Sequence, residues 1–158
     1  MIQDVTLQFY IAKHGNLLDK MIAWWTAPWR MKLNKDFLHI PSHVEIEVIE
    51  GVGFSASPRE GIVRFKSIDF DSGRWVPVTI RAELDMYFVD AVLGSRYDTC
   101  GIFCHEFLPL DVQSDTRWWC SEVCAAVIGW PTKPNPYELW LYAKKKSAIM
   151  VKTMGDYR

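Results

Sequence analysis

Apolar and polar residues alternate in several short stretches of the first half of the chain, as they do in half-buried β-strands. In the stretch that opens at Ser42, this alternation places His43 and Glu45 on the same face of the strand. The glycines that follow mark a turn, so the next segment is expected to return as the second strand of a hairpin. The predicted strands cover residues 5–11, a segment from residue 42, and residues 54–57, 61–68 and 75–80.

Apolar residues at helical spacing predict helices between and after these strands. Pro28 ends the first helix, and Gly94 and Gly129 close two later ones. The tryptophans of the first helix are expected to pack in the core, with a substrate or membrane surface as the alternative. The predicted helices cover residues 17–25, 82–93 and 118–128, with a further short candidate at 100–107. Residues 26–41 and the tail from residue 137, with its solvated cluster of three lysines, receive no assignment.

These elements predict one α+β domain over residues 1–158, with an antiparallel sheet packed against two or three helices. A length of 158 residues fits a single domain. Hydrophobic residues make up 49% of the chain, which is too apolar for a disordered protein. The formal net charge of -1 argues against general nucleic-acid binding, because phosphate neutralisation needs a basic surface.

The compartment is predicted from apolar runs and cysteines. No apolar run approaches the roughly 20 residues of a membrane span, and the first residues lack the basic and apolar regions of a secretory signal. Four cysteines without such a signal favour reduced thiols over a disulfide framework. We therefore expect synthesis and folding in the cytosol. The sequence does not indicate an oligomeric state.

Cys120 is the strongest candidate for a reactive group. A helix that begins near Cys120 would place the sulfur at the positive end of the helix dipole, among backbone N–H groups that lack a helical acceptor. In general such a position favours the thiolate, and the same N–H groups can stabilise an oxyanion during acyl transfer. An equally weighted alternative is that Cys120 is a buried small apolar residue, as most free cysteines are.

His43 is the candidate base for this thiol. A cysteine nucleophile needs a base, usually a histidine, and a third polar group that orients the imidazole. Glu45 lies two residues further on the same face, and Ser55 on the returning strand is a rival for the orienting role. Because a serine brings no charge to an imidazolium, Glu45 is preferred. Taken alone, His43 would be interpreted as a polar residue at a strand edge.

The order of these motifs resembles that of a known group of enzymes. A histidine opens a strand with a hairpin behind it, a Tyr-Asp pair is followed by glycine at residues 97–101, and Cys-Ser-Glu at residues 120–122 opens a helix. This arrangement, over about residues 9–142, resembles the circularly permuted NlpC-like, papain-fold cysteine hydrolases, the YiiX-like group. The strings at residues 42–45 and 54–61 also look like small uncharacterised proteins of tailed bacteriophages.

The resemblance implies a permuted papain-like hydrolase domain in which Cys120 is the nucleophile, His43 the general base and Glu45 the orienting group. It implies neither a cofactor nor a metal. The substrate would be an amide in a peptide or a peptidoglycan-like polymer of the cell wall. A phage origin would place the protein in the host cytoplasm or in the virion. Three further residues would lie near this centre in structural roles: Tyr97, Asp98 and Glu122.

Three other functions stay open. A structural zinc site is one, although paired cysteine ligands more often have a two-residue gap than the three-residue gap seen here. The residues concerned are Cys100, Cys104, His105, Cys120 and Cys124. A non-catalytic phage structural or binding protein on the same fold, its cleft blocked by tryptophans, is the second. A lipid acyltransferase or esterase of the same superfamily is the third.

Overall fold

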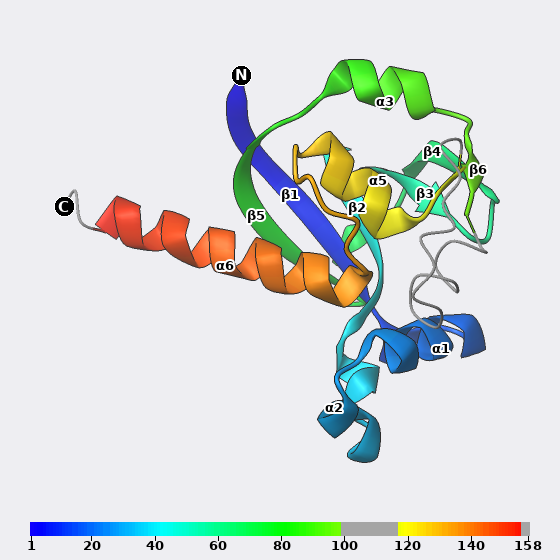
Figure 1. Cartoon of the computed structure of the whole chain (residues 1–158). Coiled ribbons are helices and arrows are strands. Elements are labelled where there is room, and N and C mark those ends of the chain that lie inside the picture. Colours follow the sequence, from blue (N-terminus) through cyan, green and yellow to red (C-terminus); the bar gives the residue numbers. More distant parts are fainter. Residues whose placement is uncertain (99–116, 156–158) are drawn as a thin grey trace.

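A curled seven-stranded sheet forms the centre of the computed structural model, in which residues 1–98 and 117–155 are described (Figure 1). Its strand order is β5-β1-β2-β3-β4-β6-β7. The strands are β1 (Ile2–Ile11), β2 (Pro41–Ile49), β3 (Val52–Ser57), β4 (Ile62–Ser67), β5 (Trp75–Glu83), β6 (Arg96–Tyr97) and β7 (Arg117–Trp118). The first five coincide closely with the strands predicted from alternation.

The sheet is mixed, so the prediction of a purely antiparallel sheet is wrong at one edge. All pairings from β5 to β6 are antiparallel, but β6 and β7 run parallel, with Arg96 opposite Arg117. Each of these two strands is only two residues long. An alternation pattern needs at least four residues to be recognised, so the sequence carries no signal for either strand.

The described residues contain five α-helices, so the prediction of two or three is also wrong. They are α1 (Leu17–Thr26), α2 (Trp29–Leu33), α3 (Met86–Val92), α5 (Cys120–Val127) and α6 (Pro136–Gly155). Short 3-10 helices cover Ala12–His14 (η1), Asp36–His39 (η2) and Phe70–Ser72 (η3). The segment at 100–107, predicted as a short helix, lies outside the described residues.

The predicted helix at 82–93 begins later than expected because its first residues extend a strand. β5 continues its pairing with β1 as far as Glu83, which lies opposite Ile2. Asp85 then caps α3, with its Oδ1 accepting a hydrogen bond of 2.9 Å from the backbone N–H of Phe88. The sequence at this junction fits both the alternation of a strand and the spacing of a helix. The pairing of β5 with β1 determines where the strand ends and therefore where α3 can begin.

The tail from residue 137, which received no assignment from the sequence, forms most of helix α6. Asn135 and Glu138 form a reciprocal cap at its start, in which each side chain accepts a hydrogen bond of 2.9 Å from the backbone N–H of the other. Leu139 and Ala143 of the first turns are fully buried against the core, and three exposed lysines follow on the solvent side. The lysines mask the apolar stripe in the sequence, which is why the tail looked mixed.

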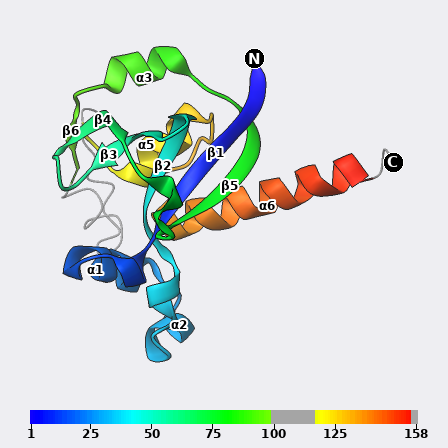
Figure 2. The same cartoon turned by 180° about the vertical axis from the view of Figure 1, so that it is seen from behind.

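Helices α5 and α6 pack against the same face of the sheet, as the front and back views show (Figures 1 and 2). The core between them is built from fully buried residues of the central strands, including Leu7, Phe9, Val44, Ile46 and Phe54. Alternation therefore separates β2 into two sides. Val44 and Ile46 belong to the apolar core, whereas His43 and Glu45 belong to a polar cluster.

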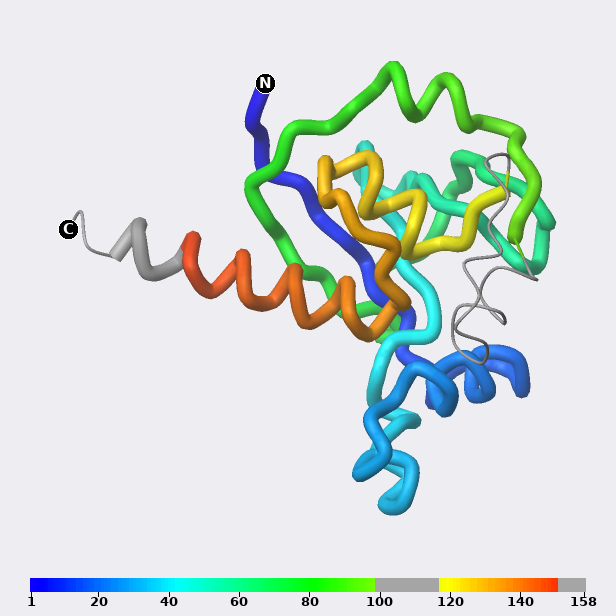
Figure 3. Tube along the Cα trace, in the orientation of Figure 1, coloured from blue at the N-terminus to red at the C-terminus, as the bar shows by residue number. Residues whose placement is uncertain are grey.

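Helices α1 and α2 occupy one end of the molecule. The chain leaves β1, passes through both helices at this end and returns as β2 (Figure 3). Asp19 joins this excursion to the sheet, because its carboxylate accepts hydrogen bonds from Ser42 at the start of β2 and from Arg59 in the β3–β4 turn, at 3.2 and 2.7 Å. Within the described ranges, no helix is both long and apolar enough to cross a membrane.

Candidate functional site

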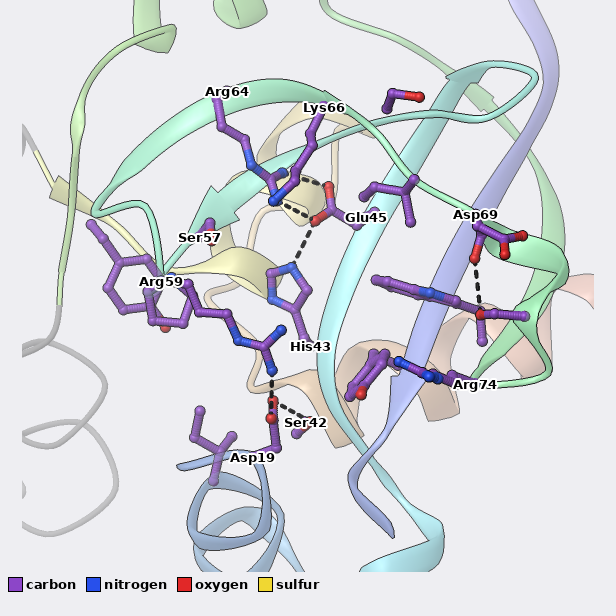
Figure 4. Close-up of a pocket in the computed structure, with 18 residues that line it drawn as sticks. Asp19, Ser42, His43, Glu45, Ser57, Arg59, Arg64, Lys66, Asp69 and Arg74 are labelled. Atoms are coloured by element: carbon purple, nitrogen blue, oxygen red, sulfur yellow. Dashed lines mark hydrogen bonds and ion pairs between the residues drawn. The ribbon is translucent and has the colours of Figure 1, made fainter. Parts of the chain in front are cut away.

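A cleft of about 370 Å³ opens at the end of the sheet where β1 ends and β2 begins (Figure 4). Residues from α1, β2, the β3–β4 turn, the end of β4, η3 and the start of β5 line it. Trp75 supplies an aromatic wall, with its ring edge-on to Tyr10 and Phe70 at centroid distances of 5.1 Å in both cases. His43 lies beside the same indole, 6.3 Å away by ring centroids. The cleft thus combines apolar wall and titratable groups.

His43 and Glu45 are brought together as the strand alternation predicts. Nε2 of His43 donates to Oε1 of Glu45 at 2.8 Å, and Glu45 is completely buried. A two-residue spacing on β2 places both side chains on one face, so the local strand geometry alone creates this contact. The carboxylate therefore fixes the orientation of the imidazole.

Arg64 of β4 holds Glu45 from the other side and was not expected from the sequence. Its guanidinium donates two hydrogen bonds to the Glu45 carboxylate, at 2.8 and 2.9 Å, and its side chain is only 13% exposed. Two parallel N–H···O bonds are the strongest geometry for such a pair. The pairing register puts Ser55 opposite Arg64, which carries the guanidinium to the face occupied by Glu45. Figure 4 shows the resulting chain of contacts from Arg64 through Glu45 to His43.

Glu60 completes this network on the solvent side. Its carboxylate accepts hydrogen bonds from Arg64 and from Lys66. Burial would raise the pKa of Glu60, but Lys66 and Arg64 outweigh it and lower that pKa to about 2. Arg64 is thereby paired with two carboxylates, and their combined effect raises its pKa against the opposing effect of burial.

Gly53 leaves the space that the Glu45 carboxylate fills. A Cβ atom at this position would lie 2.9 Å from Oε2 of Glu45 and 3.0 Å from the side chain of Ile68. Side-chain atoms do not approach one another so closely, so any larger residue would displace the carboxylate. The hairpin glycine that marks a turn in the sequence therefore also provides room for the polar cluster.

The pKa values of the pair favour the doubly charged form. Burial alone would lower the pKa of His43, but the charge of Cys120, a hydrogen bond to its side chain and the Glu45 carboxylate together raise it to about 10. Burial would likewise raise the pKa of Glu45, but His43 and Arg64 lower it below its ordinary value. At neutral pH the imidazole therefore carries the proton and the carboxylate is ionised.

Cys120 is the first residue of α5 and contacts His43 with its side chain. The start of this helix is fixed by the carbonyl of Pro134, which accepts hydrogen bonds from the Ser121 hydroxyl at 2.6 Å and from the Trp119 indole at 3.2 Å. Glu122 accepts from the backbone N–H of Trp119 at 3.4 Å, in the structural role expected for it. Cys120 itself is only 2% exposed and is not among the residues that line the cleft.

Tyr97 lies close to this pair and lines the cleft. Burial raises the pKa of its hydroxyl well above the ordinary value, and the nearby charges of Cys120 and Asp98 act in the same direction. The hydroxyl is therefore protonated at neutral pH and can donate a hydrogen bond. Asp98 is buried next to it, and its backbone N–H donates to the carbonyl of Trp118 at 3.0 Å.

Ser55 does not reach His43 through any hydrogen bond between described residues. Its hydroxyl lies 3.4 Å from the carbonyl of Ala56 and 3.8 Å from the sulfur of Cys124. Cys124 is fully buried in the apolar core, and this burial raises the pKa of its thiol well above the ordinary value. The two cysteines of α5 thus have different surroundings, one beside an imidazole and one in the core.

The described part of the chain contains no group of three or more residues placed to hold a metal ion. Cys100, Cys104 and His105, which entered the zinc alternative, lie outside the described residues. Cys120 and Cys124 carry free thiols on successive turns of α5.

Comparison with protein-family models, with curated proteins and with solved structures finds no match to this chain.

The structure thus joins the three residues singled out in the sequence and adds two that were missed. His43 and Glu45 share a strand face, and Cys120 reaches His43 from the start of a helix. Arg64 and Gly53 were missed because their roles depend on strand pairing across the sheet. The available signal for Arg64 was a lone arginine between two apolar residues of a predicted strand.

Proposed function

We propose that this protein is a thiol-dependent hydrolase that cleaves an amide bond, with Cys120 as nucleophile, His43 as general base and acid, and Glu45 as orienting group. The observation that carries the proposal is the chain of contacts from Cys120 through His43 to Glu45. In this chain Cys120 and Glu45 outweigh the effect of burial on His43 and raise the pKa of its imidazole to about 10. A nucleophile paired with a base that a third group orients is the arrangement that acyl transfer requires.

In the proposed reaction, the sulfur of Cys120 attacks the carbonyl carbon of the amide while His43 holds the proton. The carbonyl oxygen becomes an oxyanion, which backbone N–H groups of the first turn of α5 are oriented to receive. When the C–N bond breaks, the imidazolium gives its proton to the leaving amine, and the acyl group stays on sulfur as a thioester. Water, losing a proton to His43, then hydrolyses the thioester and releases a carboxylic acid.

The substrate class is proposed from the cleft. Its wall joins the aromatic ring of Trp75 to charged groups of both signs, including Arg59, Arg74 and Asp69. A peptide or a peptidoglycan-like polymer presents amide bonds flanked by charged and apolar groups, which suits such a wall. We therefore propose an amide of this class as the substrate.

A non-catalytic binding protein on the same fold is the second candidate, and one observation favours it. Cys120 is 2% exposed and is not among the residues that line the cleft, so a ligand held by the cleft residues alone does not touch the sulfur. In this alternative the ion-paired cluster around Glu45 would serve to position the cleft, and a ligand would bind without reacting.

Acyl transfer to the thiol distinguishes the two candidates. The protein would be incubated with p-nitrophenyl acetate, a small activated ester, and the acetylated residue identified by mass spectrometry at mildly acidic pH, where thioesters persist. The hydrolase proposal predicts acetylation at Cys120 and turnover of the ester. Panels of muropeptides, peptide amides and lipid extracts would then identify the bond.

Matched variants control this experiment. Cys120→Ala and His43→Ala should abolish turnover, whereas Cys124→Ala, which removes a buried thiol from the same helix, should retain it. Turnover that survives in Cys120→Ala, or acetylation confined to lysines, would reject the proposed nucleophile. The non-catalytic candidate predicts no acetylated Cys120 in the folded protein.

A further inference from the structure

Helix α1 carries apolar residues on the face that points away from the protein. At 100° per residue, its buried positions Asp19, Ile22, Ala23 and Thr26 fall on one side. Leu17, Met21 and Trp24 fall on the opposite side, and they are 74%, 37% and 43% exposed. A solvent-facing helix stripe is ordinarily polar, so this stripe is a feature that the packing of the fold does not explain.

Helix α2 also exposes apolar residues. Trp29 and Leu33, four residues apart, share one face of this short helix and are 71% and 66% exposed. No residue of α2 is buried. Lys32 ties α2 to α1, because its ammonium group donates to the backbone carbonyl of Trp25 at 3.3 Å and lies 4.8 Å from the ring centroid of Trp24. Both helices project from the same end of the molecule (Figures 1 and 2).

The same segment concentrates positive charge. Residues 12–40 contain five basic and two acidic residues, a formal charge of +3 in a chain whose net charge is -1. One of the two acids, Asp19, is neutralised by its ion pair with Arg59 outside the segment. Four of the five basic side chains are exposed, namely Lys13, Lys20, Arg30 and Lys35. Exposed apolar residues and basic residues are therefore interleaved over α1 and α2.

We propose that the exposed surface of α1 and α2, defined by Leu17, Met21, Trp24, Trp29 and Leu33, docks on the surface of an anionic lipid bilayer. Tryptophan and leucine on one side with lysine and arginine around them is the composition of helices that lie in the membrane interface. Each basic residue near an anionic surface adds to the electrostatic attraction. A second copy of this chain is the less favourable occupant, because two surfaces with a charge of +3 repel one another.

This docking has a geometric consequence for the cleft. Asp19 and Ile22, on the buried side of α1, contribute to the cleft wall. A bilayer that covers the exposed side of α1 would therefore lie one helix diameter, about 10 Å, from the cleft. The inference concerns binding alone and holds whether or not Cys120 is catalytic.

Flotation with vesicles tests the proposal. The full chain would be mixed with vesicles of equimolar phosphatidylglycerol and phosphatidylcholine, or of phosphatidylcholine alone, and separated on a density gradient. We expect flotation with the anionic vesicles, weaker flotation in high salt, and at least about tenfold less binding to the neutral ones, as loss of two or more charge contacts implies.

Variants on exposed positions keep the fold and isolate the surface. Trp24→Ser with Trp29→Ser, and separately Lys20→Gln with Arg30→Gln, should each reduce binding to anionic vesicles by about tenfold or more. Tyr87→Ser removes an aromatic residue that is 92% exposed on α3 and should bind like the wild type. Circular dichroism and urea midpoints would verify that all variants fold equally.

Three results would overturn the proposal. In the first, the wild type fails to float with anionic vesicles. In the second, the tryptophan variant floats as well as the wild type. In the third, light scattering gives a dimer whose mass falls to that of the monomer in the tryptophan variant, which would make this surface a protein interface.

Discussion

At the scale of single residues, the candidate site depends on one buried carboxylate with two cationic partners. Glu45 is completely buried, accepts from His43 on one side and receives both N–H groups of Arg64 on the other. A buried charge is tolerated only when it is paired and hydrogen-bonded. Arg64 contacts the carboxylate from the other side, so Glu45 keeps a charged partner when His43 is neutral.

The protonation of His43 is the first residue-scale prediction. In the wild type the imidazole should titrate with a pKa of about 10, and Cys120→Ser and Glu45→Gln should each lower it, because each removes a group that favours the imidazolium. NMR of the histidine ring protons against pH measures this directly. A wild-type value near the ordinary 6.5, unchanged in both variants, would contradict the contact chain.

The contribution of Arg64 to stability is the second residue-scale prediction. Arg64→Met leaves the buried Glu45 with one partner instead of two, and removing one member of a buried pair costs about 3–5 kcal/mol in the free energy of unfolding. Lys66→Met is the matched control, because it removes a half-exposed partner of Glu60 and should cost no more than about 1 kcal/mol. Urea denaturation gives both values. Equal losses of unfolding free energy in the two variants would show that the buried Arg64–Glu45 pair stabilises the fold no more than the half-exposed Lys66–Glu60 pair.

At the scale of elements, alternation and helical spacing predicted most of what forms the site. The strand that carries His43 and Glu45 and the helix that starts at Cys120 were both expected from local patterns, and both are present. A period of two residues determines which side chains share a strand face, so the His43–Glu45 contact needs no knowledge of the rest of the fold.

The parts that sequence patterns missed depend on contacts between distant segments. Arg64 meets Glu45 only through the register of β3 and β4, and β6 and β7 are too short to show alternation. The tryptophans of α1 were expected to pack in the core. Both sides of this helix carry apolar residues, and the sequence pattern does not reveal which of the two sides faces the protein. Here the small residues Ala23 and Thr26 face inward, and Trp24 faces outward.

Asp19 is the element-scale prediction, since it joins α1 to the sheet. Its carboxylate caps α1 by accepting from the backbone N–H of Asn16 at 2.9 Å and also accepts from Ser42 and Arg59. Asp19→Ala should therefore lower the free energy of unfolding by about 2–3 kcal/mol and speed hydrogen exchange in α1. Asp36→Ala, an exposed acid of η2, should stay within about 0.5 kcal/mol. An Asp19 variant as stable as this control would contradict the anchoring role.

At the scale of the whole molecule, the two proposed surfaces meet at one end. The cleft, the His43 side of β2 and the exposed surface of α1 and α2 all lie where β1 gives way to β2 (Figures 1 and 4). The segment of residues 12–40, which forms part of this end, is positive in a chain that is slightly negative overall.

Acid sensitivity is the prediction for the whole molecule. The folded-state pKa of Glu45 lies below its ordinary value of 4.5, so ionised Glu45 contributes stability that is complete above that value and is lost as the pH falls through the folded-state pKa. The stability difference between wild type and Glu45→Gln should therefore be largest near neutral pH and shrink below about pH 4. Urea denaturation over this range tests it. A difference that is constant with pH would mean that the carboxylate charge does not stabilise the fold.

The most direct test of the central claim is the pH dependence of alkylation at Cys120, read by mass spectrometry with a small reagent such as iodoacetamide. The proposed pair predicts that Cys120 reacts near pH 6 at least about tenfold faster than Cys124, because His43 can accept the proton of the Cys120 thiol, whereas the Cys124 thiol lies in the apolar core. His43→Ala should abolish that advantage. If Cys120 instead reacts no faster than Cys124, or if His43→Ala leaves its rate unchanged, the thiol and the imidazole do not act together and the hydrolase proposal fails.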